Sequence, residues 1–592
     1  MNAAGDNTLV RLLARRVAQT PAAVAYRIEN RAGGWDALSW GDFGARVARL
    51  RRSLQAAGLR RGDRLALIAP VSFEWETLHH AALALGAVVV GLDGHDLPER
   101  IAAMADVADI TAWAVTQTRP LAQLSADRRG RARLLIALAA LDGHGLDGLP
   151  PARRWDELLA PARDGGDDAA DAAVDTGAGA PAPGDEATVI FTSGTTGAPK
   201  GIAYSHGQLC LAVDRIGEAY SFAGAQSRLL CWLPLSNLFQ RIVNLAAMRQ
   251  GAATSLLADP RRVMEVVAQV EPEIFIGVPR FYEKLYEGIR ANIAAQPAWR
   301  RRIANWAWDV GRRAAAGPQG SRAPSALARR LAERLVLARV RAVMGTRLRC
   351  MVSGSAPMPR LLLDELRALG WLVLEAYGLS ENVMPMAMNR LDDYRLGSVG
   401  RPMPGNEIVV DAEGAIKVRG AGLFRGYLGD AGPAPFDAEG YYATGDLGAI
   451  DADGYLRLTG RSGDLIKTST GRRVAPAGIE ARLGGLPGID QVMVVGNGRK
   501  GLVALCTCSG ADDAAARATR EFALRARVAT LGEHERPLAV ALLRRPFSID
   551  AGELTPNLKL RRAAIEQRHA ALIQSAYERA DSSPAGAGLP IV

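Results

Sequence analysis

The residues with the clearest capacity for chemistry are glycines, hydroxyl side chains and a lysine that lie in one run. They are Thr192, Ser193, Gly194, Thr195, Thr196, Gly197 and, after Ala198 and Pro199, Lys200. Glycines let a backbone approach a polyanion closely, hydroxyl groups donate hydrogen bonds, and a lysine adds positive charge. Because the apolar segment 187–191 is typical of a buried strand, the run predicts a phosphate-binding loop that follows a strand. A Walker loop is excluded, because Gly201 rather than Ser or Thr follows Lys200, and a flexible hairpin without a ligand is the alternative.

The elements before this loop are typical of an alternating α/β domain. Residues 64–69 are apolar after Arg64 and predict a strand, a helical pattern spans about 75–85, and residues 86–90 have the composition of a second buried strand. A strand, a helix and a strand in succession predict a βαβ unit and hence an α/β sheet. A chain of 592 residues is too long for one hydrophobic core, so that we expect two or more domains.

Three segments differ in composition from these elements. Residues 162–186 are mostly Ala, Asp, Gly and Pro and predict a surface linker or flexible insert. Residues 296–349 are helical in composition and basic, with thirteen arginines against two acidic residues and three tryptophans near their start. Basic amphipathic helices with Trp can lie on membranes, and packing against the protein's own sheet is the alternative. Residues 581–592 predict a frayed tail.

The overall composition narrows the class of protein. Apolar residues make up 48% and charged residues 23% of the chain, as in globular rather than disordered proteins. The net charge of +10 could attract nucleic acid, an anionic membrane or a polyanionic cofactor. The charge alone does not choose among these three partners.

The cysteines and the N-terminus indicate a reducing compartment. The count of five cysteines is odd, no regular disulfide framework is present, and the first residues lack the apolar core of a signal peptide. Cys506 and Cys508 lie in an apolar run, 502–508, that predicts a buried strand rather than a zinc site. The longest run of apolar residues and glycines, 81–92, is shorter than the roughly 20 residues that span a bilayer. We therefore expect a cytoplasmic protein that is soluble or bound peripherally at the inner face of a membrane.

Six motifs, in order from residue 192 to residue 561, resemble those of the adenylate-forming (AMP-binding) superfamily of acyl- and aryl-CoA ligases, luciferases and peptide-synthetase adenylation domains. The loop at 192–201 resembles the signature of this superfamily. The other motifs are Ser353-Gly354-Ser355-Ala356-Pro357, Tyr377-Gly378-Leu379-Ser380-Glu381, Tyr442-Ala443-Thr444-Gly445-Asp446, the hinge segment 460–467 and the C-terminal lysine motif 555–561. One such motif would be weak support, whereas six in order are strong.

Three segments resemble one branch of the superfamily, the long-chain fatty acyl-CoA synthetases (long-chain-fatty-acid–CoA ligases). They are residues 278–284 before a long helical insert, the hinge loop 467–471 and the segment 554–560. Four residues depart from the pattern of that branch. Asn237 and Gln240 stand where His and Glu are common, Gly463 takes the pivot position where Asp or Lys is usual, and Thr470 replaces a glycine.

The resemblance implies an α/β fold with a large N-terminal domain and a small, mobile C-terminal α+β domain. It implies an adenylation domain at residues 1–462, with the two inserts at about 162–186 and 296–349, a small domain at 463–580 and a tail at 581–592. It also implies Gly463 as the hinge about which the small domain rotates between two half-reactions. In the first, ATP converts a carboxylic acid such as a medium- or long-chain fatty acid into acyl-AMP; in the second, coenzyme A takes the acyl group.

The same resemblance implies roles for single residues. Lys559 would bridge the carboxylate and the α-phosphate, Glu381 would hold Mg²⁺, and Thr192 would act with the phosphate loop in catalysis. Tyr377 would stack on adenine, Asp446 and Arg461 would bind the ribose, and Gly471 would approach coenzyme A. The residues implied to contact ATP or AMP are Thr192, Ser193, Gly194, Thr195, Thr196, Gly197, Lys200, Ser353, Gly354, Ser355, Ala356, Pro357, Tyr377, Gly378, Ser380, Asp446 and Arg461.

Two other functions stay open on the sequence. An acyl-AMP ligase could pass the acyl group to a carrier protein or an amine instead of coenzyme A. A degenerate, non-catalytic member could serve as a nucleotide- or lipid-binding scaffold, although the presence of Lys200, Glu381, Asp446, Arg461 and Lys559 together argues against it. The implied partners are small molecules and, through the basic insert, a membrane surface, but not nucleic acid.

Overall fold

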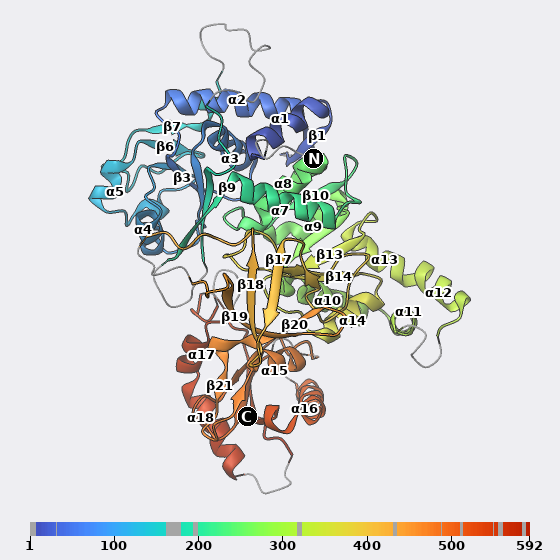
Figure 1. Cartoon of the computed structure of the whole chain (residues 1–592). Coiled ribbons are helices and arrows are strands. Elements are labelled where there is room, and N and C mark those ends of the chain that lie inside the picture. Colours follow the sequence, from blue (N-terminus) through green and yellow to red (C-terminus); the bar gives the residue numbers. More distant parts are fainter. Residues whose placement is uncertain are drawn as a thin grey trace.

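The computed structural model describes residues 7–592 except 31, 161–178, 193–198, 317–322, 430–434, 487, 509–512, 549, 555–559 and 583–587. Two large sheets and their helices form the upper part of the molecule in Figure 1, and the C-terminal elements, in orange and red, lie below them. The helices α11 (Ala298–Ala315), α12 (Ala326–Ala332) and α13 (Ala338–Arg341) extend to the right, away from the sheets. None of the helices in the described ranges is long and apolar enough to cross a membrane.

The first sheet has seven strands in the order β7-β6-β5-β3-β4-β8-β9. The strands are β3 (Arg64–Ile68), β4 (Val88–Gly91), β5 (Ala112–Val115), β6 (Leu134–Ala137), β7 (Ala152–Arg154), β8 (Glu186–Phe191) and β9 (Gly201–Ser205). All neighbours are parallel except β8 and β9. The predicted βαβ unit is confirmed, because α3 (Phe73–Leu85) connects the parallel pair β3 and β4. The strand predicted before the loop is also confirmed, as β8.

The second sheet has nine strands in the order β16-β15-β14-β13-β12-β10-β11-β1-β2. The strands are β1 (Val24–Glu29), β2 (Trp35–Ser39), β10 (Arg228–Cys231), β11 (Ala253–Leu256), β12 (Ile274–Gly277), β13 (Cys350–Ser353), β14 (Val373–Tyr377), β15 (Ala387–Met388) and β16 (Arg401–Pro402). The six strands from β14 to β1 are parallel, and β2, β15 and β16 add antiparallel pairs at the two edges.

Helices cover the parallel strands of both sheets. They are α1 (Leu9–Gln19), α2 (Trp40–Ala56), α4 (Pro98–Val107), α5 (Ala126–Arg131), α6 (Trp155–Leu159), α7 (His206–Ala219), α8 (Leu238–Gln250), α9 (Val263–Val270), α10 (Pro279–Ala294) and α14 (Arg360–Ala368), with short turns of helix η1 (Arg119–Leu121) and η2 (Pro260–Arg262). Alternate residues of β3 point to opposite faces of the sheet, so that Leu65 and Leu67 belong to one core and Ala66 and Ile68 to another. The larger core also contains Leu230 of the second sheet, and it therefore joins the two sheets.

A four-stranded antiparallel sheet follows the second large sheet. Its strands are β17 (Asn406–Val410), β18 (Ala415–Gly420), β19 (Tyr442–Ile450) and β20 (Leu456–Arg461), paired in chain order. The chain then forms the turn η5 (Ser462–Asp464) and the short hairpin of β21 (Ile466–Lys467) and β22 (Arg473–Val474).

The C-terminal residues form cores of their own. Strands β23 (Gln491–Val495), β24 (Leu502–Thr507) and β25 (Pro537–Leu543) are flanked by α15 (Pro476–Leu483), α16 (Ala514–Ala529), the turn η6 (Glu533–Glu535), α17 (Arg562–Arg568) and α18 (Ala570–Ser582). β24 confirms the buried strand predicted around Cys506. The large cluster ends at Leu456, whereas the two C-terminal clusters begin at Ile466 and at Met493. Separate cores are compatible with the predicted boundary at 462–463, which stays a prediction.

The structure corrects the frayed tail predicted for residues 581–592. α18 continues to Ser582, and Ile591 forms a parallel bridge with Val540 of β25. The Val592 N–H donates to the Val540 carbonyl at 2.9 Å. Leu589 and Ile591 also pack on a C-terminal core. The last residues therefore extend the sheet, because their apolar side chains and free backbone groups meet the edge of β25.

The predicted insert at 162–186 lies mostly outside the described residues. Its described end is bound to the turn before β3, because the Arg61 guanidinium donates to the Gly179 carbonyl at 2.8 Å and to the Asp185 carboxylate.

Candidate functional site

Three parallel strands lead into predicted site residues at their carboxyl ends. Thr192 follows β8, Ser353 is the last residue of β13, and Tyr377 is the last residue of β14. β13 and β14 are neighbours, with Ser353 opposite Glu375. In open α/β sheets ligands bind at the carboxyl edge of the parallel strands, which β8 supplies in the first sheet and β13 and β14 supply in the second.

The predicted phosphate loop is closed by the β8–β9 hairpin. Phe191 pairs with Gly201, and the Thr192 N–H donates to the Lys200 carbonyl at 3.1 Å. The Lys200 ammonium lies 4.9 Å from the centroid of the Tyr427 ring, within the range of a cation–π contact. Ser193, Gly194, Thr195, Thr196 and Gly197 lie outside the described residues, so that their phosphate contacts stay a prediction.

Tyr377, Asp446 and Arg461 meet through one carboxylate. The Tyr377 hydroxyl donates to Asp446 Oδ2 at 2.6 Å, and Arg461 Nε donates to Oδ1 at 2.8 Å. Asp446 and Arg461 are opposite each other in the β19–β20 pair. The Asp446 side chain is 7% exposed and that of Arg461 is 55% exposed. Burial raises the pKa of Tyr377, and the Asp446 carboxylate beside it raises the pKa further, so that the tyrosine stays a donor at neutral pH.

Glu381 lies in a second cluster, which links it to the loop. The Tyr427 hydroxyl donates to Glu381 Oε1 at 2.8 Å, and the same ring carries the Lys200 contact. The Tyr204 hydroxyl of β9 donates to the carbonyl of Ser380 at 2.6 Å. Within the described ranges, Glu381 forms no ion pair. A carboxylate that is oriented by a neutral donor and has no cationic partner fits the binding of a hard cation such as Mg²⁺.

Tyr427 is the functional candidate that sequence reasoning missed. It stands in an irregular segment after Gly426, where no motif or periodicity marks it. Burial raises the pKa of Tyr427, as do the hydroxyl of Tyr442 and the charge of Glu381. Its importance follows only from its position between Lys200 and Glu381.

The segment 353–357 makes a sharp turn after β13. Ser355 has a φ of +77°, in the left-handed region that a residue with a side chain rarely adopts. The buried hydroxyl of Ser353 has no hydrogen-bond partner among the residues that the structure describes. Strained turns and unpaired buried donors are common where a ligand completes the site. The structure places Gly354, Ala356 and Pro357 in the same turn beside β14, as the sequence indicates, and their nucleotide contacts stay a prediction.

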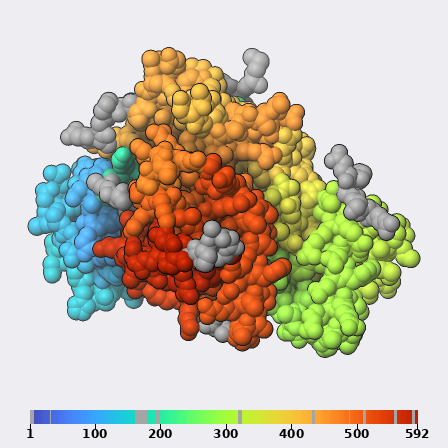
Figure 2. All heavy atoms as spheres, turned by 90° about the horizontal axis from the view of Figure 1, so that it is seen from below, coloured from blue at the N-terminus to red at the C-terminus, as the bar shows by residue number. Residues whose placement is uncertain are grey.

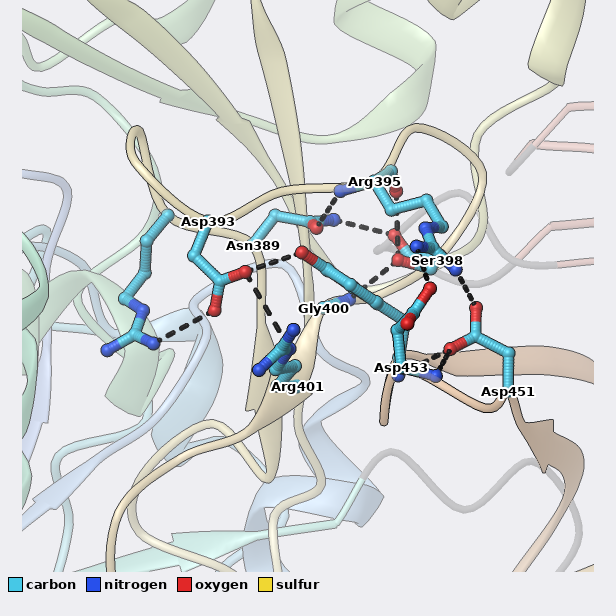
Figure 3. A network of polar contacts seen from close by, with 10 residues as sticks. Asn389, Asp393, Arg395, Ser398, Gly400, Arg401, Asp451 and Asp453 are labelled. Atoms are coloured by element: carbon cyan, nitrogen blue, oxygen red, sulfur yellow. Dashed lines mark hydrogen bonds and ion pairs between the residues drawn. The ribbon is translucent and has the colours of Figure 1, made fainter.

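A polar network fixes the chain that follows Gly378 and Glu381 against the β19–β20 turn (Figure 3). Arg395 bridges Asp451 and Asp453, with two N–O distances of 2.5 Å. Asn389 accepts from the Arg395 N–H at 2.9 Å and donates to the Ser398 carbonyl at 2.6 Å. A Cβ at Gly400 would lie 2.0 Å from the carbonyl carbon of Met388, so that only glycine fits there. The network thus connects the β14 side of the site to the strands that carry Asp446 and Arg461.

Gly463, the predicted hinge, and Gly471, the predicted coenzyme A residue, lie in two short turns of the chain after β20. Gly463 lies in η5, and the Ser462 hydroxyl before it donates to the Gly445 carbonyl at 3.0 Å. Gly471 has a φ of +81° in the turn between β21 and β22, and a Cβ there would meet open space. The Thr468 and Thr470 hydroxyls are 2.8 Å apart in the same turn. Lys559 lies outside the described residues, so that its position stays a prediction.

Asn237 and Gln240, which depart from the pattern of the long-chain branch, have structural roles at the start of α8. Asn237 caps the helix by accepting from the Phe239 N–H at 3.0 Å. Gln240 is buried and donates to Asn244, which in turn donates to Glu76 of α3 at 2.6 Å. These contacts stabilise the packing of α8 on α3.

One cluster in the described part of the chain has the composition of a metal site, namely Glu76, His79 and His80. Burial raises the pKa of Glu76 to about 7 and lowers the pKa of His80 to about 4. Glu76 already accepts from Tyr26 and Asn244, and the buried guanidinium of Arg241 interacts with it. Because a neighbouring cation disfavours a second one, we interpret the cluster as part of the core.

Two family models match the chain. A family model described as AMP-binding enzyme matches residues 13–428, and one described as AMP-binding enzyme C-terminal domain matches residues 463–581. The chain is 29% identical to the long-chain-fatty-acid–CoA ligase FadD15 of Mycobacterium bovis, over 92% of this chain and 93% of that protein. It is 28% identical to the long-chain-fatty-acid–CoA ligase ACSBG1 of Mus musculus, over 92% and 82% of the two chains.

Solved structures show the same fold. The anthranilate CoA ligase AuaEII in complex with anthranoyl-AMP matches with a TM-score of 0.72 and 20% identity, over 96% of this chain and 98% of that one. The O-succinylbenzoate coenzyme A synthetase MenE of Bacillus subtilis in complex with AMP matches with a TM-score of 0.66 and 20% identity, over 93% and 97%. The expected fold, a large α/β domain followed by a small C-terminal one, is confirmed.

Proposed function

Since the chain belongs to the AMP-binding enzyme family, whose model matches residues 13–428, we propose that it activates a medium- or long-chain fatty acid to acyl-AMP and then to acyl-CoA. Membership in this family makes the chain an adenylate-forming ligase, and its members that form acyl-CoA use ATP, Mg²⁺ and coenzyme A. The fatty acid is the finer part of the proposal, and the names of the relatives FadD15 and ACSBG1 support it. The observation that carries the proposal is the meeting of Tyr377, Asp446 and Arg461 at the edge where β14 ends.

The chemistry requires that two anions approach each other. In the first step a carboxylate oxygen of the acid bonds to the α-phosphorus of ATP, and the bond to pyrophosphate breaks. In the second step the thiol sulfur of coenzyme A bonds to the acyl carbon, AMP leaves, and the thiol proton is released. Positive charge on the enzyme must offset the repulsion of the first step.

The residues of this chain would share that task. Lys200 and the loop from Thr192 would hold the β- and γ-phosphates, and Asp446, positioned by Tyr377 and Arg461, would accept hydrogen bonds from the ribose hydroxyls. Mg²⁺, when bound, would neutralise phosphate charge, and Glu381, oriented by Tyr427, would hold it. Lys559 would contact the reacting carboxylate and the α-phosphate.

We further propose that the two steps use two arrangements of the domains 1–462 and 463–580. The separate cores on either side of residues 456–466 support this proposal, as does η5 at the junction. Rotation about Gly463 would move Lys559 out of the site after the first step and bring Gly471 towards coenzyme A. The open space at Gly471 is compatible with the approach of a ligand to its backbone.

Tyr377→Phe is expected to weaken ATP binding while leaving turnover nearly unchanged. The variant keeps the ring but removes the hydroxyl that donates to Asp446 Oδ2. A hydrogen bond to a charged group contributes about 1.5 kcal/mol or more, so that KM for ATP should rise about tenfold. The matched control is Tyr394→Phe, which removes a hydroxyl that accepts from Arg367 instead of donating to Asp446. An unchanged KM for ATP, or an equal rise in the control, would show that Tyr377 does not position Asp446.

The activity itself is tested by ATP–pyrophosphate exchange with a panel of carboxylic acids, followed by thioester formation with free coenzyme A. We expect exchange that increases from short to medium or long acyl chains, and a thioester product with the same acids. Exchange without a thioester would support transfer to a carrier protein or an amine instead. The absence of exchange with every acid would leave a nucleotide- or lipid-binding protein.

A further inference from the structure

A helical arm extends from the second sheet. It consists of α11 (Ala298–Ala315), α12 (Ala326–Ala332), the π-helical turn η3 (Glu333–Leu337), α13 (Ala338–Arg341) and η4 (Ala342–Met344). The arm is the lobe that extends to the right in Figure 1 and lies at the lower right in Figure 2. The arm lies within the basic insert 296–349, which has thirteen arginines. The sequence of this insert leaves open whether it packs on the protein or faces a membrane.

One face of the arm is fixed to the protein. Ala307, Trp308 and Val310 of α11 are buried in the large core. A Cβ at Gly311 would lie 2.0 Å from the Ala368 carbonyl oxygen of α14, so that glycine is required for this close contact. The Arg312 guanidinium donates to Glu365 of α14 at 3.0 Å. The alternative from the sequence, packing against the protein itself, is therefore correct for this face.

The remaining surface of the arm carries a large share of the exposed apolar side chains. Of the twelve exposed large apolar side chains in the described residues, six lie on the arm. They are Trp299 (60% exposed), Ile303 (36%), Leu327 (68%), Leu331 (42%), Leu335 (46%) and Val343 (39%). Leu327, Leu331 and Leu335 are four residues apart and therefore follow one side of the helix. These apolar side chains are therefore exposed to solvent instead of being packed in a hydrophobic core.

The arginines around these side chains are mostly uncompensated. The two acidic residues of the arm are already used, since Asp309 pairs with Arg312 and Glu333 pairs with Arg341. Eight further arginines are exposed and form no ion pair with any residue in the described ranges: Arg300, Arg301, Arg302, Arg313, Arg329, Arg330, Arg334 and Arg339. Arg330 and Arg334 follow Leu327 and Leu331 by three residues, so that cations flank the leucine stripe.

We propose that this outer surface of the arm docks on an anionic lipid bilayer. Tryptophan and leucine side chains at a charged helix surface enter the boundary between headgroups and acyl chains, while arginines reach the lipid phosphates. The inference goes beyond the proposed function and does not depend on it, although an acid that dissolves in bilayers would be taken up where it accumulates. Nucleic acid would match the arginines but not the exposed Leu327, Leu331 and Leu335.

The test is co-sedimentation of the full chain, without ATP or acid, with two kinds of vesicle. We expect binding to vesicles of phosphatidylcholine with phosphatidylglycerol at low salt and little binding to phosphatidylcholine alone. High salt should weaken the binding, because screening limits the reach of charges to about 3 Å at molar ionic strength. Because the assay contains no substrate, its outcome is separate from that of the exchange assay.

Two variants connect the binding to the arm. The combined change Arg330→Gln, Arg334→Gln and Arg339→Gln should weaken binding about a hundredfold, because each cation near an anionic surface contributes about 1 kcal/mol. The combined change Leu327→Ser, Leu331→Ser and Leu335→Ser should weaken it at least about tenfold. Both changes affect exposed side chains, so that thermal melting should match that of the original protein.

Matched controls lie outside the arm. Arg60→Gln, Arg153→Gln and Arg457→Gln together remove three exposed arginines, and Leu97→Ser with Phe522→Ser removes apolar side chains that are 63% and 75% exposed. Neither control should change vesicle binding. The proposal is overturned if the chain stays in the supernatant at low salt, or if the arm variants bind as well as their controls. Binding of the arm to DNA without binding to vesicles would assign the surface to nucleic acid instead.

Discussion

Lys559→Ala is expected to reduce adenylation by a factor on the order of 10² to 10³, as is typical when an enzyme loses one group that stabilises developing charge. The carboxylate of the acid and the α-phosphate of ATP are both anionic, and a lysine between them would offset their repulsion. Thioester formation from a supplied acyl-adenylate should fall much less, because in the proposed second arrangement Lys559 has left the site. ATP–pyrophosphate exchange measures the first step, and release of AMP from acyl-adenylate with coenzyme A measures the second.

The control for Lys559 is another lysine of the small domain. Lys500→Ala removes a half-exposed lysine that pairs with Asp581 at the surface, so that neither half-reaction should change. Equal loss of both steps in Lys559→Ala would mean that the residue stabilises the domain or that the two arrangements do not exist. The structure describes Leu554 and Leu560, which bridge each other on either side of residues 555–559, but not Lys559 itself.

Glu381→Gln should raise the concentration of Mg²⁺ needed for half-maximal activity about tenfold or more and lower the turnover. The amide keeps the size of the side chain and can still accept from Tyr427, but it loses the charge that attracts a divalent cation. A Mg²⁺ titration of the exchange rate at saturating ATP measures the shift. A titration that overlays that of the original protein would remove Glu381 from the list of metal ligands.

Glu375 provides the matched control for this experiment. It lies on the same strand as Tyr377, and burial raises its pKa to about 7, while the N–H of Met358 donates to its carboxylate at 3.1 Å. At pH 7 Glu375→Gln therefore removes about half of a unit charge, and it should leave the Mg²⁺ titration unchanged because Glu375 is not a proposed metal ligand. Tyr427→Phe should shift the titration less than Glu381→Gln, because it frees the carboxylate without removing it.

The local pattern of apolar residues was sufficient to predict the helix and strands that precede the phosphate loop. The apolar residues of β3, α3, β4 and β8 follow the periods of strands and helices, so that their positions could be predicted from neighbours in the sequence. The end of the chain shows the limit of this reasoning. The segment 588–592 is only five residues long and contains Gly588 and Pro590, and only the free edge of β25 makes it part of a sheet.

In the basic insert, the sequence likewise predicted the helices but not the contacts of their side chains. Its composition predicted helices, and α11 to α13 confirm them. Composition could not separate Arg312 and Arg341, which are paired, from Arg330 and Arg334, which are exposed without an ion-pair partner in the described residues. That difference depends on whether an acidic side chain from another element comes close.

By itself the sequence determined the phosphate-loop candidate at 192–200, the order of the motifs, the family that they resemble and the elements with a clear period. Only the tertiary structure decided which residues meet. Tyr377 and Arg461 share the carboxylate of Asp446, and Tyr427 stands between Lys200 and Glu381, although up to 227 positions separate the members of these clusters (427 minus 200). The physical reason is that hydrophobic periodicity acts over a few residues, whereas contacts between distant side chains require the registers of whole sheets.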